Sequence, residues 1–128
     1  MIEQTQFVLA VPDFETSIPF YRDALGFQIH DMGDPGWRMY VRDQCRIMAG
    51  ECRDAIPPAE LGDHSYFAYL VVSDIEAEFE RVSKYGATIT KSLREEPWGM
   101  REFGVRTADG HRLMLAQRLS KTTASQDS

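Results

Sequence analysis

The chain has 128 residues, a mass of 14.6 kDa, a formal net charge of -6 and a pI near 5.0. This length is typical of one compact domain, and the acidity argues against nucleic acid as a main partner while being compatible with a cationic ligand. No stretch approaches the roughly 20 apolar residues of a membrane span, and the N-terminus lacks the pattern of a signal peptide. We therefore expect a cytoplasmic protein, with Cys45 and Cys52 reduced.

The first half of the chain predicts a strand, a helix and three further strands. A short apolar run over Phe7–Val11 is typical of a buried strand. The helix is expected to start near Ser17, because Pro19 is best tolerated in a first turn, with Asp13 or Ser17 as its cap. Gly26 is expected to end it. The three predicted strands are Phe27–Asp31, Trp37–Val41 and Cys45–Gly50.

The second half predicts the same order of elements. Residues 53–64 contain two adjacent prolines and are expected to form a linker. An apolar strand over Tyr66–Val72 leads into a helix capped by Asp74. Residues 120–128 are small and polar, which favours a disordered tail. The strands expected after the helix are Ala87–Lys91, Met100–Arg106 and His111–Gln117.

The two halves repeat one outline. Val11–Ile29 and Val72–Ile89 both read as a strand end, a helix with one apolar stripe, a Gly stop and a new strand. The chain is therefore predicted to be βαβββ over residues 6–52 and again over residues 65–119. Each unit alone leaves an open sheet edge, so we expect a single α+β domain over residues 1–119, with two repeats forming a curved mixed-sheet cup.

Two motifs carry a family resemblance. The run FYRDALGF from Phe20 to Phe27 and Asp109-Gly110-His111 on the last hairpin resemble the vicinal oxygen chelate superfamily. This superfamily includes glyoxalase I, extradiol dioxygenases, and fosfomycin- and bleomycin-resistance proteins. The resemblance covers nearly all of Phe7–Leu119 and implies the glyoxalase/bleomycin resistance/dioxygenase fold. It leaves the function open, because this scaffold carries several chemistries.

The metal positions of the family carry unusual residues here. Metal-using members place His or Glu at positions that correspond to Gln6, Met48, Phe67 and Met114. An amide, two thioethers and a phenyl ring do not suit a divalent cation, so the resemblance implies no metal and no cofactor. By strand alternation, His111 is expected to point away from Met114 and the cup. The other histidines, expected at the surface or hydrogen-bonded, are His30 and His64.

The expected cup lining is apolar and aromatic. If Met48 and Met114 face inward, alternation along the first strands of the two units adds Phe67 and Tyr69 and two small apolar residues. Thioethers and aromatic rings suit flat organic ligands, but for the methionines alone ordinary core packing is the favoured interpretation. The two small apolar residues are Val8 and Ala10.

The tryptophans favour ligand binding. Residues 96–103, EPWGMREF, are similar to the Pro-Trp-Gly-Arg-Glu-Phe segment of bleomycin-resistance proteins, with Met100 as an extra residue. In that family aromatic rings stack on the drug, and the resemblance places the stacking positions at Trp37, Tyr69 and Trp98. A tryptophan that clamps its own loop is the alternative.

The resemblance implies a metal-free homodimer that sequesters a planar ligand, which can be cationic, without turnover. It implies neither a nucleic-acid nor a membrane partner. Three alternatives stay open: a lyase or dioxygenase whose metal ligands this register misplaces, a metal-free enzyme that uses Arg101, Glu102 or Tyr69, and a structural dimer with a filled core. The predicted ligand-binding residues are Gln6, Trp37, Met48, Phe67, Tyr69, Trp98, Glu102 and Met114.

Overall fold

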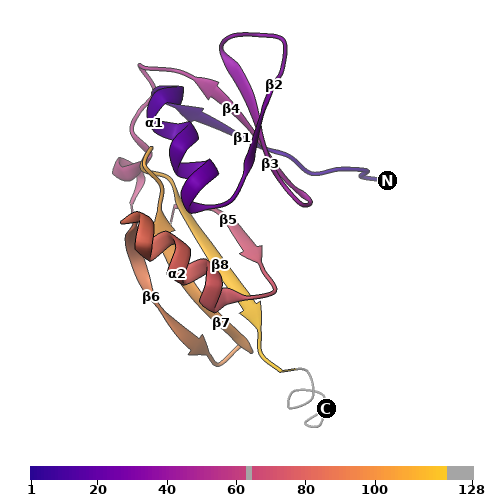
Figure 1. Ribbon diagram of the computed structural model, residues 1–128, viewed down its shortest axis with the longest axis vertical. Coiled ribbons are helices and arrows are strands. Elements are labelled where there is room, and N and C mark those ends of the chain that lie inside the picture. The colour runs from indigo at the N-terminus through magenta and orange to yellow at the C-terminus, as the bar shows by residue number, and fades with distance from the viewer. Residues whose placement is uncertain (63–64, 121–128) are drawn as a thin grey trace. The chain divides into compact units, whose positions relative to one another are not determined.

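The computed structural model describes residues 1–62 and 65–120, which form two compact units divided between Pro57 and Pro58 (Figure 1). The predicted βαβββ order is confirmed in both units. His64 and residues 121–128 of the predicted tail lie outside the described residues. The first unit contains β1 (Phe7–Val11), α1 (Phe14–Pro19), the π-helical turn η1 (Phe20–Ala24), β2 (Gln28–Asp31), β3 (Trp37–Arg42) and β4 (Cys45–Glu51). The second contains the 3-10 turn η2 (Pro58–Leu61), β5 (Tyr66–Val71), α2 (Ile75–Tyr85), β6 (Thr88–Glu96), β7 (Met100–Arg106) and β8 (Arg112–Arg118).

Each unit builds one four-stranded mixed sheet. The strand orders are β1-β4-β3-β2 and β5-β8-β7-β6. In both sheets the first strand pairs in parallel with the last, and the other pairs are antiparallel. The α+β class is therefore confirmed. The single domain over residues 1–119 stays a prediction.

The first helix differs from its prediction. It begins at Phe14 rather than near Ser17, because the Asp13 carboxylate caps it by accepting a hydrogen bond from the backbone N–H of Thr16 at 2.8 Å. Pro19 therefore lies inside the helix, where it lacks the N–H that the ladder needs. The next turn widens into η1.

The core of the first unit lies between this helical segment and one face of its sheet. Tyr40 on β3 is fully buried, with its ring 4.7 Å from that of Tyr21 on η1. The Tyr40 hydroxyl donates a hydrogen bond of 2.8 Å to Oγ of Ser17, which is also fully buried. This bond satisfies two polar groups inside an apolar layer. The apolar strand residues on this face include Leu9, Val11, Ile47 and Ala49.

The second unit repeats this layer. The Asp74 side chain caps α2, and Gly86 ends the helix with φ of 91°, as predicted. In Figure 1, α2 runs along the sheet of its unit, and the Phe79 ring lies 5.1 Å from that of Phe103 on β7. Within the described part of the chain, no helix is long and apolar enough to cross a membrane. Other buried sheet residues on this side are Ala68, Val105, Leu113 and Leu115.

The edge strand β6 is longer than its predicted Ala87–Lys91. It continues to Glu96, and its pairing with β7 shifts register twice, between Ile89 and Lys91 and between Lys91 and Arg94. Such bulges insert extra residues into one strand, so strict alternation of faces fails along β6. The polar second half of the strand has no apolar periodicity that predicts an extension.

The buried Tyr40–Ser17 pair gives a stability test. Tyr40→Phe and Ser17→Ala should each lower the free energy of unfolding by about 1–2 kcal/mol, since each leaves one buried hydroxyl without its partner. The double variant should cost less than the sum of the two. Urea unfolding measures this, with Ser83→Ala at an exposed position of α2 as a control. Additive losses, or losses no larger than that of the control, would contradict the pairing.

Candidate functional site

The sheet of the second unit has two faces, one that packs on α2 and one that points away from this helix. We call the latter the open face. Strand pairing assigns its residues, because cross-strand partners point to the same side. Its central rows combine aromatic, acidic and basic side chains. The open-face residues are Tyr66, Tyr69 and Val71 on β5, Arg112, Met114, Ala116 and Arg118 on β8, Met100, Glu102, Gly104 and Arg106 on β7, and Lys91, Arg94 and Glu96 on β6.

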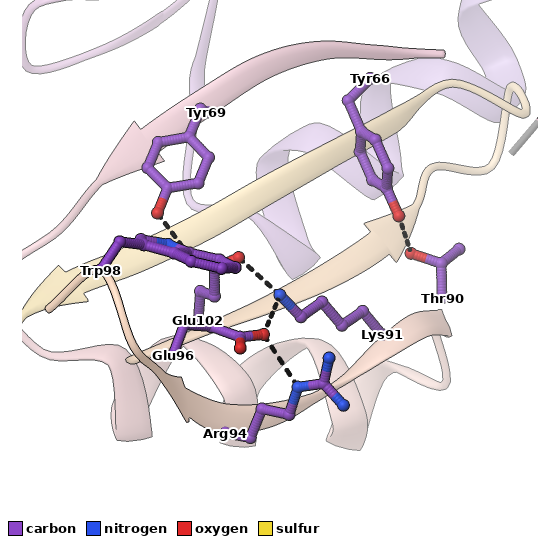
Figure 2. A network of polar contacts seen from close by, with 8 residues as sticks. All are labelled: Tyr66, Tyr69, Thr90, Lys91, Arg94, Glu96, Trp98 and Glu102. Atoms are coloured by element: carbon purple, nitrogen blue, oxygen red, sulfur yellow. Dashed lines mark hydrogen bonds and ion pairs between the residues drawn. The ribbon is translucent and has the colours of Figure 1, made fainter. Parts of the chain in front are cut away.

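Glu102 lies at the centre of the polar contacts on this face. One carboxylate oxygen, Oε1, accepts hydrogen bonds from the Tyr69 hydroxyl at 2.5 Å and from Nε1 of Trp98 at 3.0 Å. The other oxygen, Oε2, accepts from Nζ of Lys91 at 2.6 Å. Figure 2 shows these side chains converging from β5, β6, β7 and the β6–β7 turn. Three predicted site residues, Tyr69, Trp98 and Glu102, are therefore neighbours.

A second carboxylate extends the network. Oε2 of Glu96 accepts from Nζ of Lys91 at 2.5 Å and from Nε of Arg94 at 2.8 Å. The Lys91 ammonium also lies over the Trp98 ring, 5.4 Å from its centroid, which is within cation–π range. Lys91 thus joins both carboxylates and the indole.

Burial and hydrogen bonding set the charge states in this network. Burial raises the pKa of Glu102, but the bonds from Lys91, Tyr69 and Trp98 outweigh it, so the pKa is lowered overall. Burial lowers the pKa of Lys91, and its bonds to Glu102 and Glu96 raise it overall. Burial raises the pKa of Tyr69 to about 12, helped by the bond to the Glu102 carboxylate. At neutral pH the network therefore holds Glu102 charged, Lys91 charged and Tyr69 neutral.

The next row of the open face is filled by side chains. The Tyr66 hydroxyl and Oγ1 of Thr90 are hydrogen-bonded at 3.0 Å. Both lie over Gly104, together with Sδ of Met114: a Cβ on Gly104 would be 2.5 Å from the threonine oxygen and 3.2 Å from the sulfur. Met114 is only 8% exposed. It therefore forms part of the floor beside Tyr69, its partner on β5.

Phe67 does not follow the expected alternation. A register irregularity between Tyr66 and Ala68 puts Tyr66 on the open face with Tyr69. The Phe67 ring packs edge-on against His111, with centroids 5.8 Å apart. His111 is 9% exposed, and burial lowers its pKa. It lies one residue from Arg112 on the open face, so its expected orientation away from Met114 agrees with the alternation along β8.

The first unit has its own open face, which holds two predicted residues. Trp37 begins β3, and a Cβ on Gly50 would be 2.8–3.0 Å from three atoms of its six-membered ring. The indole thus lies flat on the sheet at Gly50. Met48 is flanked by Met39 and Val8 on the neighbouring strands. Gln6 precedes β1 and is exposed.

The residues at the metal positions of the family do not fit a metal. In the first unit they are Gln6 and Met48, and in the second Phe67 and Met114. Thioethers and a phenyl ring are poor donors for a divalent cation, which prefers imidazole, carboxylate or thiolate. Among residues 1–62 and 65–120, no group of three His, Cys, Asp or Glu side chains is arranged to hold a metal ion.

Sequence reasoning missed several members of the network. Lys91 was assigned only as a strand end, and Tyr66, Thr90 and Arg94 received no role. Each lies next to an irregular position in strand pairing, where alternation gives no orientation. The sequence offers one signal: Lys91 is the single charged residue in the run Ala87–Ser92. A cation there indicates an acidic partner when the strand is half buried.

The fold is a duplicated βαβββ fold with an open sheet face that joins aromatic rings to a buried ion-pair network. The sequence profile of the Glyoxalase/Bleomycin resistance protein/Dioxygenase superfamily matches residues 3–115. The chain belongs to this superfamily, and the resemblance read from its motifs is confirmed.

One sequence relative and two solved structures are similar to this chain. Glutathione transferase FosA of Serratia marcescens is 30% identical over 109 residues, which are 84% of this chain and 74% of that protein. TnmS3, an antibiotic binding protein from Streptomyces sp. CB03234, has a TM-score of 0.70 at 21% identity, covering 92% of this chain and 98% of that one. The bleomycin-binding protein from Streptomyces verticillus, complexed with copper(II)-bleomycin, has a TM-score of 0.64 at 23% identity, covering 94% and 98%. At these identities the two solved structures show the fold alone.

The Tyr69–Glu102 bond can be tested by titration. The phenolate absorbance of the wild type and of Tyr69→Phe should rise together up to about pH 11, because Tyr69 ionises only near pH 12. Glu102→Gln removes the facing charge, so Tyr69 should then titrate at lower pH, revealed by subtracting the Glu102→Gln/Tyr69→Phe double variant. A wild-type difference already complete near pH 10 would show that the carboxylate does not hold this phenol.

Proposed function

We propose that this protein binds a planar aromatic small molecule without a metal and sequesters it, as an antibiotic-binding member of its superfamily. The observation that carries the proposal is the state of Trp98. Its indole is 61% exposed, yet its Nε1 is fixed by the buried Glu102 carboxylate. An exposed ring costs hydration free energy. An exposed ring that is also anchored is suited to receive a flat partner.

Preorganisation makes stacking effective. Tyr69 is 46% exposed, and its hydroxyl shares Oε1 of Glu102 with Trp98. Two aromatic side chains are therefore held by one acceptor and have little rotamer freedom left to lose on binding. Offset or edge-to-face contacts with each ring favour aromatic ligands. The solved neighbours named for binding an antibiotic and copper(II)-bleomycin support a ligand of this kind.

The charge states argue for binding rather than turnover. A phenol with a pKa of about 12 is a poor base at neutral pH, and a carboxylate with a lowered pKa is a poor acid. Arg101, also considered as a catalytic group, points to the helix side and pairs with Glu76 on α2. These charge states and contacts support a positioning role for the three residues.

The remaining predicted residues complete the proposal. Trp37 and Met48 would offer a second aromatic and soft apolar surface from the open face of the first unit. We propose that the protein acts as a homodimer, as the family resemblance implies, and that the open face of each unit takes part in ligand binding. Met114 would contribute to the floor, Gln6 to the rim and Glu102 to the support of the stacking rings. Phe67 is left out of the proposed site, because its ring packs against His111 and Tyr66 lies on the open face instead.

Binding should depend on Trp98. The neutral planar probe 9-anthracenemethanol should give a saturable rise in its fluorescence anisotropy with wild-type protein. Trp98→Ala should weaken binding about two- to tenfold, since a stacked aromatic pair contributes roughly 0.5–1.5 kcal/mol. Tyr85→Ala, which removes an exposed ring on α2, should leave binding unchanged. No saturable binding, or equal loss in both variants, would overturn the proposal.

An enzyme is the second candidate, favoured by one observation. The relative in Serratia marcescens, a glutathione transferase, is similar over 84% of this chain. A transferase or another superfamily reaction would then need reactive groups or a metal that the predicted register does not provide.

Metal content separates the two candidates. Protein purified without chelator should contain far less than one equivalent of zinc, nickel, iron or manganese by elemental analysis, because the donor set at the family's metal positions is unsuited to them. A stoichiometric metal that is lost on Met114→Ala would instead support the enzyme. Met39→Ala, on the first sheet, serves as the matched thioether control.

A further inference from the structure

The charge on the open face differs in sign from the charge on the whole chain. The chain carries -6, which by itself favours a cationic ligand. Strand pairing, however, puts five basic residues and two carboxylates on the open face of the second unit. The basic residues are Lys91, Arg94, Arg106, Arg112 and Arg118, and the acidic ones are Glu96 and Glu102.

The two carboxylates on this face are also withdrawn from solvent. The side chain of Glu102 is 2% exposed and that of Glu96 is 8% exposed, and each is paired with Lys91. Two of the cations nearest to these carboxylates are more accessible: Lys91 is 20% exposed and Arg94 is 65% exposed. Arg112, by contrast, is 5% exposed and donates a hydrogen bond to the Gly62 carbonyl, so it is not counted among the accessible cations. A ligand that reaches this face therefore meets ammonium and guanidinium groups rather than carboxylate oxygens.

The surroundings of the Trp98 indole also disfavour a cationic ligand. The Lys91 ammonium already lies over the Trp98 ring, so a ligand that stacks on this ring shares it with a positive charge. A cationic ligand stacked on this ring would be repelled by the Lys91 ammonium, because the two charges would lie close together with little water between them. An electron-rich or anionic aromatic ring would be attracted.

We propose that the planar ligand is neutral or anionic, carrying a group such as a carboxylate or phenolate, and that Lys91 is the residue that selects against planar cations. This inference rests on the proposed function and specifies its ligand. It departs from the cationic ligand that the family resemblance implies. Glu102 acts as a positioning residue in this arrangement, because it holds Lys91 and Trp98 together.

Three probes with the same ring system test the charge preference. Anthracene-9-carboxylate, 9-anthracenemethanol and 9-anthracenylmethylammonium share the anthracene ring and carry small substituents that are anionic, neutral and cationic at pH near 7. We expect the carboxylate to bind wild-type protein about tenfold more tightly than the ammonium, with the alcohol between them, as a Coulomb interaction at partly screened contact distance predicts. Equal or tighter binding of the ammonium would overturn the inference.

Two variants locate the source of the preference. Lys91→Gln should abolish or reverse the preference, and Arg94→Gln should reduce it without leaving the buried Glu102 unpaired. Lys84→Gln makes the same charge change on the exposed surface of α2, where Lys84 pairs with Glu80, and should leave the preference intact. A charge preference that survives both open-face variants would overturn the role of Lys91.

The outcomes separate this inference from the proposed function. If the alcohol binds in a Trp98-dependent manner but the ammonium binds as well as the carboxylate, only the inference fails. If none of the three probes binds, both fail. Circular dichroism of each variant checks that the fold is retained.

Discussion

The buried Glu102 carboxylate is the constraint on which the open face depends. A carboxylate that is 2% exposed is stable only when its oxygens are hydrogen-bonded and its charge is paired. The donors come from three places in the chain: β5 through Tyr69, β6 through Lys91 and the β6–β7 turn through Trp98. One acid therefore fixes the edge strand, the turn and an exposed aromatic ring in a single geometry.

The same constraint explains why the exposed aromatic rings are ordered. An indole at a turn would normally sample several rotamers, and a flexible ring loses entropy when a ligand immobilises it. Here the cost is borne during folding, when Nε1 of Trp98 bonds to Glu102. In the first unit, contact with Gly50 has a comparable effect, since the Trp37 ring lies directly on the backbone. A hydrogen bond thus orders the Trp98 ring, and packing on Gly50 orders the Trp37 ring.

Regular features of the chain could be predicted from its sequence, and irregular ones could not. The repeat, the Gly86 helix end and the positions of Tyr69 and Met114 on β5 and β8 follow from periodicity alone. The pairing irregularity between Tyr66 and Ala68 places Phe67 against His111, and no feature of the amino-acid sequence predicts this irregularity. The bulges along β6 likewise obscured Lys91. Bulges arise from pairing between distant segments, so local pattern carries little information on them.

Net charge and site charge are separate quantities. The acidic residues that make the chain -6 include exposed ones on α2, such as Glu80, whereas those on the open face are buried and paired. Because exposed charges are screened within about 10 Å at ordinary ionic strength, distant acids contribute little to a ligand at the sheet. Nearby, partly buried groups dominate the local potential. The arrangement of Lys91 between Trp98 and Glu102 therefore outweighs the overall acidity in deciding which ring can stack there.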